Sequence, residues 1–185
     1  MRVFIAIDID ESIRQGLAQL QADIRRAADV HKSDAKWVDP HDMHLTLKFL
    51  GEIRDNESVE VCRITEEAAA GHDRFDLDIE SVGAFGTRVL WVGVGRGADR
   101  LARVQSDLEQ RLAEAGWPPE NRPFTGHLTL CRIRAPRAGK KLADTVRAYE
   151  NHFIGTTSVD ALTVYHSQLT PKGPLYTALD TCALR

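Results

Sequence analysis

The chain has 185 residues, of which 43% are hydrophobic, so it is long enough for one compact domain with a substantial core. A net charge of -3 argues against a protein that coats long nucleic acid, because such binding relies on many Lys and Arg side chains. No segment approaches the roughly 18 apolar residues of a membrane span or resembles a secretory signal. We therefore expect a cytoplasmic, unprocessed protein. Neither a disulfide framework nor a zinc knuckle is indicated by its cysteines, Cys62, Cys131 and Cys182.

The chain opens with the pattern of a strand followed by a helix. Residues 3–7 form a short apolar run typical of a buried strand. Asp10 is then an expected N-cap, and a loop around residues 37–40 follows the helix. The helix is predicted by apolar residues at helical spacing, namely Ile13, Leu17, Leu20, Ile24 and Ala27.

A second strand, a helix and a third strand follow. Residues 44–52 predict a strand with Leu45, Leu47 and Phe49 on one face. A helix of about four turns then begins near Asp55 or Asn56 and ends at Gly71. Residues 75–80 alternate between apolar and acidic, as a strand with one wet face does.

The second half repeats this order. Residues 89–94 predict a buried strand, a helical stripe ends at Gly116, and a proline-rich loop over residues 118–123 leads to the next strand. A weaker helix and three strands are predicted for residues 141–149, 153–157, 161–166 and 176–182. We therefore interpret residues 1–185 as one domain of two lobes, with an internal repeat of approximately 1–85 and 86–166 and a returning C-terminal strand.

One tetrapeptide occurs twice, as His44-Leu45-Thr46-Leu47 and as His127-Leu128-Thr129-Leu130. On a strand, the imidazole and the hydroxyl of His-x-Thr point to the same face, because side chains alternate with period two. The two histidines are 127 minus 44, or 83, residues apart, and the preceding strands begin 89 minus 3, or 86, residues apart. The motifs thus occupy matching places in the repeat, and a cleft between the lobes could bring them together.

Two facing imidazoles can catalyse phosphoryl transfer without a metal. One takes a proton from the attacking oxygen, and the other gives a proton to the leaving oxygen. The hydroxyls of Thr46 and Thr129 can donate to the non-bridging phosphate oxygens. Neither motif has Asp, Glu or Cys at metal-ligand spacing, so the sequence disfavours a metal site, and we expect no cofactor. The alternative to a catalytic role is that each His-x-Thr is an ordinary feature of a strand.

Taken together, these residues resemble the 2H phosphoesterases, and specifically the RNA 2',3'-cyclic phosphodiesterases also called 2'-5' RNA ligases (LigT-like). The resemblance covers nearly the whole chain and rests on residues 2–8, 37–52, 83–85, 122–132 and 164–169, with Gly173 and Tyr176. One departure is Gly126, where the family usually has proline before the second histidine.

The resemblance implies an α+β, two-lobed fold with antiparallel sheets lining a central cleft and helices outside. It also implies metal-independent hydrolysis of a terminal 2',3'-cyclic phosphate to a 2'-phosphate, with possible reversal as 2'-5' RNA ligation that needs no ATP. By family likeness, His44 would protonate the departing O3' and His127 would activate water. The expected partners are RNA ends or nucleotides bearing the cyclic phosphate, and we expect a monomer with no obligate protein partner.

Phe49 and Arg132 each follow their histidine by five residues and could sandwich the terminal base. Strict alternation opposes this, since it puts both on the face away from the histidines, so a β-bulge or the twisted end of the strand would be needed. Phe49 can equally be ordinary core. Alternation also predicts that Cys131 borders the cleft. Six basic residues could guide an RNA end, although such charges are usually solvated surface: Lys48, Arg122, Arg134, Lys140, Lys141 and Lys172.

Two other functions are compatible with these residues. One is an RNA-end or nucleotide binding module that does not turn over its ligand. The other keeps the chemistry but acts on 2'-5' oligonucleotides or small cyclic nucleotides. Because both histidines and both threonines are present, the sequence favours an enzyme.

Overall fold

The computed structural model describes residues 1–171 and 173–185. Its elements follow one another as β1 (Arg2–Ile7), α1 (Glu11–Ala28), β2 (Ala35–Trp37), η1 (Pro40–Asp42), β3 (Leu45–Glu52), η2 (Asp55–Glu57), α2 (Ser58–Ala69), β4 (Phe75–Phe85), β5 (Val89–Val94), α3 (Ala98–Glu114), β6 (Leu128–Ile133), α4 (Pro136–Val146), η3 (Arg147–Tyr149), β7 (Phe153–Val159), β8 (Ala161–Thr170) and β9 (Gly173–Ala183).

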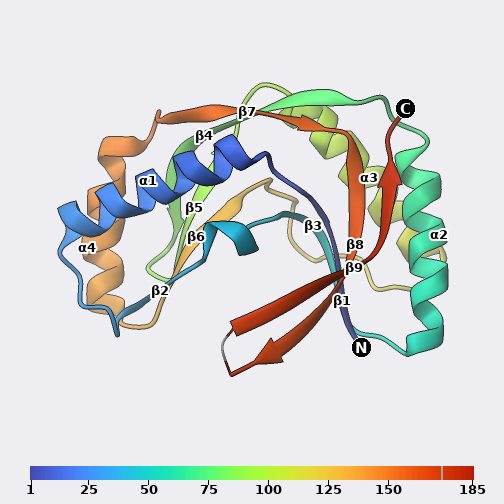
Figure 1. The fold of residues 1–185 in the computed structure, drawn as a ribbon, viewed down its shortest axis with the longest axis horizontal. Coiled ribbons are helices and arrows are strands. Elements are labelled where there is room, and N and C mark those ends of the chain that lie inside the picture. The colour runs from blue at the N-terminus through green and yellow to red at the C-terminus, as the bar shows by residue number, and fades with distance from the viewer. Residues whose placement is uncertain (172) are drawn as a thin grey trace.

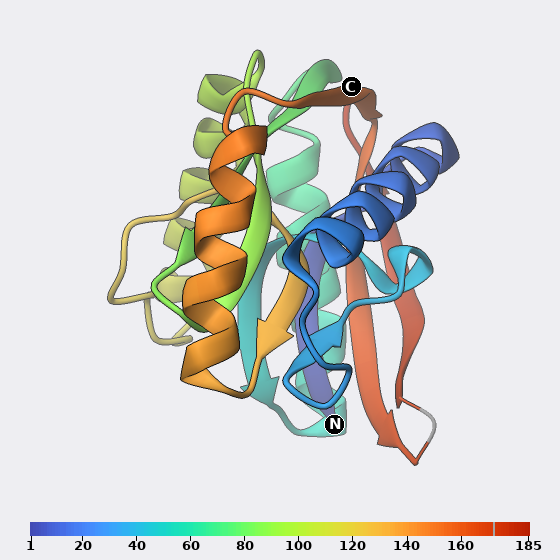
Figure 2. The same cartoon turned by 90° about the vertical axis from the view of Figure 1, so that its left-hand side faces the viewer.

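The strands form two antiparallel sheets, ordered β3-β1-β8-β9 and β2-β6-β5-β4-β7. Apart from the short edge strand β2, the orders β3-β1-β8-β9 and β6-β5-β4-β7 are equivalent, which agrees with an internal repeat. Strands are also exchanged: β4 from the first half of the chain lies in the second sheet, and β8 from the second half lies in the first. α1 and α4 lie at one end of the molecule and α2 and α3 at the other (Figure 1), and Figure 2 views it from the α1 and α4 end.

The helices form where the apolar periodicity predicts them, but their ends differ. α4 begins at Pro136, five residues before the predicted residue 141, and ends at Val146. α1 buries Ile13, Leu17, Leu20 and Ile24 as expected, but its last buried residue is Ala28 and not the predicted Ala27. This position completes the four-residue spacing from Ile24. The short strand β2, which three pairs with β6 define, ends at Trp37, the first residue of the expected loop over residues 37–40.

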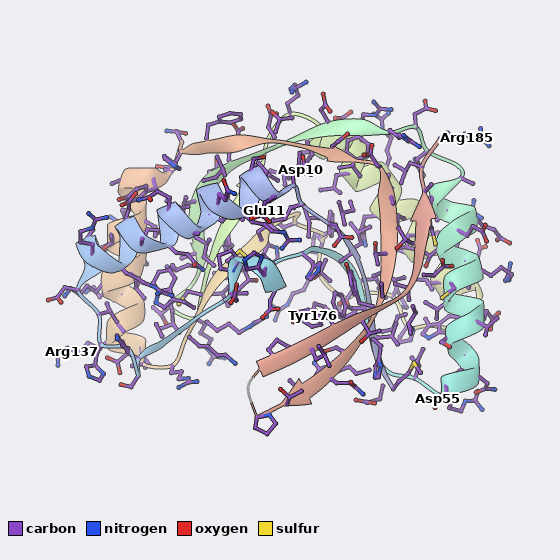
Figure 3. All side chains as sticks on the ribbon, viewed as in Figure 1. Asp10, Glu11, Asp55, Arg137, Tyr176 and Arg185 are labelled. Atoms are coloured by element: carbon purple, nitrogen blue, oxygen red, sulfur yellow. The ribbon has the colours of Figure 1, made fainter. Side chains whose placement is uncertain are left out.

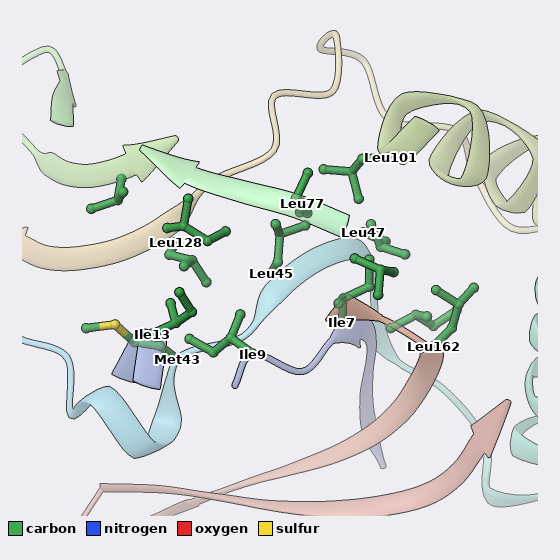
Figure 4. Packing of buried hydrophobic residues seen from close by; sticks show 14 of the residues in the cluster. Ile7, Ile9, Ile13, Met43, Leu45, Leu47, Leu77, Leu101, Leu128 and Leu162 are labelled. Carbon is green, nitrogen blue, oxygen red and sulfur yellow. The ribbon is translucent and has the colours of Figure 1, made fainter. Parts of the chain in front are cut away.

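The hydrophobic core joins the two motif strands. Leu45 and Leu128, which directly follow the two histidines, are both fully buried and belong to one cluster. Figure 4 shows both side chains among the packed residues. Because adjacent side chains on a strand point to opposite faces, burial of these leucines turns each histidine away from the core. Within the described part of the chain, no helix is long and apolar enough to cross a membrane.

Candidate active site

The motif strands β3 and β6 share one burial pattern and one irregularity. After each histidine, the residues are successively buried, half-buried, buried, buried and exposed. The strand register shifts in both at the third residue after the histidine: Leu47 is skipped in the pairing with β1, and Leu130 in the pairing with β5. Such a shift is a β-bulge, and it turns the side chains that follow to the other face.

The first bulge puts Phe49 on the histidine face of β3. Its side chain is 54% exposed, so the prediction that Phe49 shares a face with Leu45 and Leu47 is wrong. The Phe4 ring contacts both site residues, with centroid distances of 5.8 Å to Phe49 and 6.1 Å to His44. Arg132 has the equivalent place on β6 and is also exposed.

The same bulges bury the residue four positions after each histidine. Cys131 is fully buried, and burial raises the pKa of its thiol to about 11. The prediction that Cys131 borders the cleft is therefore wrong, because the bulge at Leu130 turns Cys131 to the face opposite the one that regular alternation gives. Lys48 is also buried, and its Nζ donates to Glu109 Oε1 and to the Pro118 carbonyl, both at 2.8 Å. It cannot guide an RNA end as proposed from the sequence. Lys172, from the same basic set, lies outside the described residues.

Both histidine rings are oriented by the same backbone contact. His44 Nδ1 lies 3.0 Å from the Asp42 carbonyl oxygen, and His127 Nδ1 lies 2.8 Å from the Thr125 carbonyl oxygen. A carbonyl oxygen only accepts hydrogen bonds, so Nδ1 carries the hydrogen in both rings. Nε2 is thereby left as the nitrogen that can exchange a proton.

The loop that carries Asp42 is held by a side chain of α1. Arg14 Nη1 donates to the carbonyl oxygens of Pro40, His41 and Met43 at 2.7, 2.9 and 3.1 Å. These contacts surround Asp42 in the sequence and fix the path of the chain into His44. Arg14 thus connects the first helix to the orientation of the first histidine.

His44 has a carboxylate beside its reactive nitrogen. Its Nε2 lies 3.5 Å from Asp8 Oδ1, and its side chain is only 8% exposed. Asp8 in turn accepts hydrogen bonds from the Tyr165 hydroxyl at 2.6 Å and the Thr163 hydroxyl at 3.0 Å. Burial lowers the pKa of His44, and the Asp8 carboxylate offsets part of that shift. Sequence reasoning assigned Asp8 no role, although a carboxylate directly after the first strand was a usable signal.

Aromatic rings pack around His44. Its ring centroid lies 4.7 Å from that of Tyr165 and 5.4 Å from that of Tyr176. Tyr176, labelled in Figure 3, is on the β8–β9 hairpin. Burial raises the pKa of Tyr176.

The surroundings of His127 are different. The Phe85 ring meets its ring edge to face at 5.1 Å. Among the residues described, no carboxylate forms an ion pair with His127. Gly126 fits here because a Cβ at this position would lie 2.7 Å from Leu101 Cδ2. Thr46 and Thr129 are half-buried at equivalent places on their strands. The described residues contain no group of three or more side chains that could bind a metal ion.

The duplicated motif strands, the exchange of β4 and β8 between the sheets and the two matching histidines are the features expected of a two-lobed phosphoesterase. A family model described as "LigT like Phosphoesterase" matches the chain twice, over residues 7–91 and 92–176. The chain therefore belongs to the LigT-like phosphoesterase family, which confirms the resemblance predicted from the sequence.

Individual relatives match all or nearly all of the chain. It is 30% identical over 188 residues to the RNA 2',3'-cyclic phosphodiesterase of Methanothermobacter thermautotrophicus, covering 100% of this chain and 99% of that protein. It is 33% identical to the protein of the same name from Archaeoglobus fulgidus, covering 95% and 96%. Among solved structures, the protein TT0787 of Thermus thermophilus superposes with a TM-score of 0.78 at 28% identity, covering 100% of this chain and 98% of that one. The two-lobed α+β fold expected from the sequence is thereby confirmed.

Proposed function

We propose that this chain is an RNA 2',3'-cyclic phosphodiesterase that hydrolyses a terminal 2',3'-cyclic phosphate to a 2'-phosphate. The observation that carries the proposal is the duplicated histidine geometry, in which Nδ1 is held by a carbonyl and Nε2 is left to exchange protons. The relatives from Methanothermobacter thermautotrophicus and Archaeoglobus fulgidus, both RNA 2',3'-cyclic phosphodiesterases by name, support the same substrate class.

In the proposed reaction, His127 Nε2 takes a proton from water as the water oxygen attacks phosphorus. The bond between phosphorus and O3' breaks, and His44 gives its Nε2 proton to O3'. Each positioned acid or base typically contributes roughly 10² to 10⁴ in rate. Burial lowers the pKa of His44, and the Asp8 carboxylate, 3.5 Å from Nε2, partly offsets this by stabilising the protonated ring. This contact supports His44 as the acid.

Four further side chains complete the proposed site. The hydroxyls of Thr46 and Thr129 donate to the non-bridging oxygens and stabilise the charge that develops there. Phe49 and Arg132 sandwich the terminal base, and the bulges in β3 and β6 remove the earlier objection from strand alternation. No resident metal or cofactor takes part in this scheme, since the two imidazoles account for both proton transfers.

The reverse reaction follows from the same proton transfers. A 5'-hydroxyl in place of water joins two RNA ends through a 2'-5' bond, and the cyclic phosphate itself is the activated donor, so ATP is not required.

We propose a cytoplasmic monomer of a single two-lobed domain that meets RNA at its ends, consistent with its net charge of -3.

The test is incubation of the purified protein with a 2',3'-cyclic nucleotide in the presence of EDTA. We expect the 2'-phosphate as product, and His44→Ala and His127→Ala should each abolish turnover with an unchanged circular dichroism spectrum. Exclusive formation of the 3'-phosphate would overturn the assignment of O3' as the leaving oxygen. Nucleotide binding without turnover by the wild type would instead identify a binding module.

A further inference from the structure

Two buried glutamines contact the bulges of the motif strands. Gln21 of α1 donates from Nε2 to the Leu130 carbonyl of β6 at 3.0 Å and to the Val38 carbonyl at 2.8 Å. Gln105 of α3 donates to the Leu47 carbonyl of β3 at 3.5 Å. The two glutamine side chains are 4% and 8% exposed. Leu47 and Leu130 are the residues that the strand pairing skips.

The two contacts are related by the internal repeat. The glutamines are 105 minus 21, or 84, residues apart, and the bulged leucines are 130 minus 47, or 83, residues apart. Each contact also crosses between repeats: a helix of the first half reaches the second motif strand, and a helix of the second half reaches the first. The duplication has therefore placed the same amide donor on the same backbone carbonyl in both lobes.

A bulge interrupts the regular ladder, so its backbone groups need other partners. β3 lies at the edge of its sheet, where no further strand supplies a donor for the Leu47 carbonyl. On β6, the Leu130 carbonyl accepts from Val38 N at 3.0 Å as well as from Gln21. Each glutamine thus stabilises the bulged conformation over a regular strand, in which the following side chains would change faces.

We propose that Gln21 and Gln105 are positioning residues that set the direction of Arg132 and Phe49, which lie two residues beyond the bulged leucines. The inference rests on the proposed function, because it gives those two side chains the terminal base as their ligand. Gln21 acts through Arg132, and Gln105 acts through Phe49. Neither glutamine touches the substrate.

The experiment replaces Gln21 by Met, which has similar length and no amide donor, and measures kcat and KM with 2',3'-cyclic AMP. We expect KM to rise about tenfold, at the lower end of the effect of losing one stacked contact to a base, while kcat changes less than about twofold. Gln15→Met is the matched control, since Gln15 is exposed on the same helix, and it should leave both constants unchanged.

A double-mutant cycle separates positioning from general loosening of the fold. In the Arg132→Ala background, Gln21→Met should raise KM by less than about twofold, because the side chain through which it acts is already gone. Equal effects of Gln21→Met in both backgrounds, or a fall in kcat without a change in KM, would overturn the inference. A wild-type protein without turnover would instead refute the proposed function.

The second glutamine provides an independent arm should Gln21→Met fail to fold. Its hydrogen bond to the Leu47 carbonyl is long, and its Nε2 also donates to Glu109 Oε2 at 3.4 Å. Gln105→Met should therefore raise KM only about threefold, and this rise should disappear in the Phe49→Ala background. Gln110→Met, on the exposed side of α3, is its control. A KM effect that persists without Phe49 contradicts the assignment for this lobe.

Discussion

The buried ion pair between Lys48 and Glu109 gives the strongest prediction about stability. Lys48 is 3% and Glu109 18% exposed, with Nζ 2.8 Å from Oε1. Replacing Lys48 by Met removes the cation and leaves the carboxylate largely desolvated, which typically costs about 3–5 kcal/mol. Glu109 keeps a hydrogen bond from the Glu120 backbone N–H at 2.6 Å, so we expect the lower end of this range, about 3 kcal/mol.

For a chain of this size, each kcal/mol lowers the melting temperature by about 2–4 °C, so Lys48→Met should lower it by about 6–12 °C. The assay is thermal unfolding followed by circular dichroism. Arg103→Met is the matched control, because it removes an exposed ion pair with Asp99 and should cost at most about 1 kcal/mol.

A compensating variant tests the cause of the loss. Combining Lys48→Met with Glu109→Met replaces the pair by two apolar side chains and should recover most of the melting temperature, since no charge is then left unpaired. A decrease for Lys48→Met no larger than that of the Arg103→Met control would refute this account of the pair. So would a double variant that melts below the single one.

Three further predictions concern protonation and burial. Asp8→Asn removes the carboxylate that partly offsets the effect of burial on His44, so the pKa of His44 should fall further. If His44 is the acid, the alkaline limb of the pH profile of kcat/KM then moves to lower pH. Movement of the acidic limb would instead make His44 the base and His127 the acid. Because burial lowers the pKa of His44 below its ordinary 6.5, the unfolded chain takes up a proton first as pH falls below this value. The free energy of unfolding is therefore highest above pH 6.5 and falls as the pH drops toward the lowered pKa. Urea titrations at about pH 7.5 and about pH 5 should show a smaller decrease in this free energy for His44→Gln than for the wild type. Equal decreases in the two proteins contradict the shift. Cys131→Ser buries a hydroxyl in an apolar site and should cost about 1–3 kcal/mol in urea unfolding while kcat stays within about twofold, and a large fall in kcat would argue for a chemical role of the thiol.

The sequence predicted those parts of the site that depend on local pattern. The duplicated His-x-Thr strands and the order of helices and strands follow from periodicity and from repetition. Alternation also predicts that His44 and Thr46 share a face, and no register shift lies between Leu45 and Thr46. It failed for Phe49 and Cys131, since both lie beyond a bulge.

A bulge is defined by the register between two strands and not by either sequence alone. Leu47 and Leu130 are ordinary strand residues, and only the pairing with β1 and β5 shows that each is skipped. The role of Asp8 was missed for a similar reason, because Thr163 and Tyr165, which orient it, lie more than 150 residues away. Long-range pairing of this kind leaves no periodic signal in the chain.

The exchange of β4 and β8 between the sheets has a consequence for synthesis on the ribosome. β1 lies inside its sheet, yet its second neighbour, β8, begins only at Ala161. One edge of β1 therefore stays unsatisfied until nearly the whole polypeptide has been translated, and during that interval it can pair with other nascent chains. A gene cut at the midpoint of the repeat would yield a first fragment without β8 and β9 and a second without β2 and β4. The two fragments could recover a complete molecule only by associating.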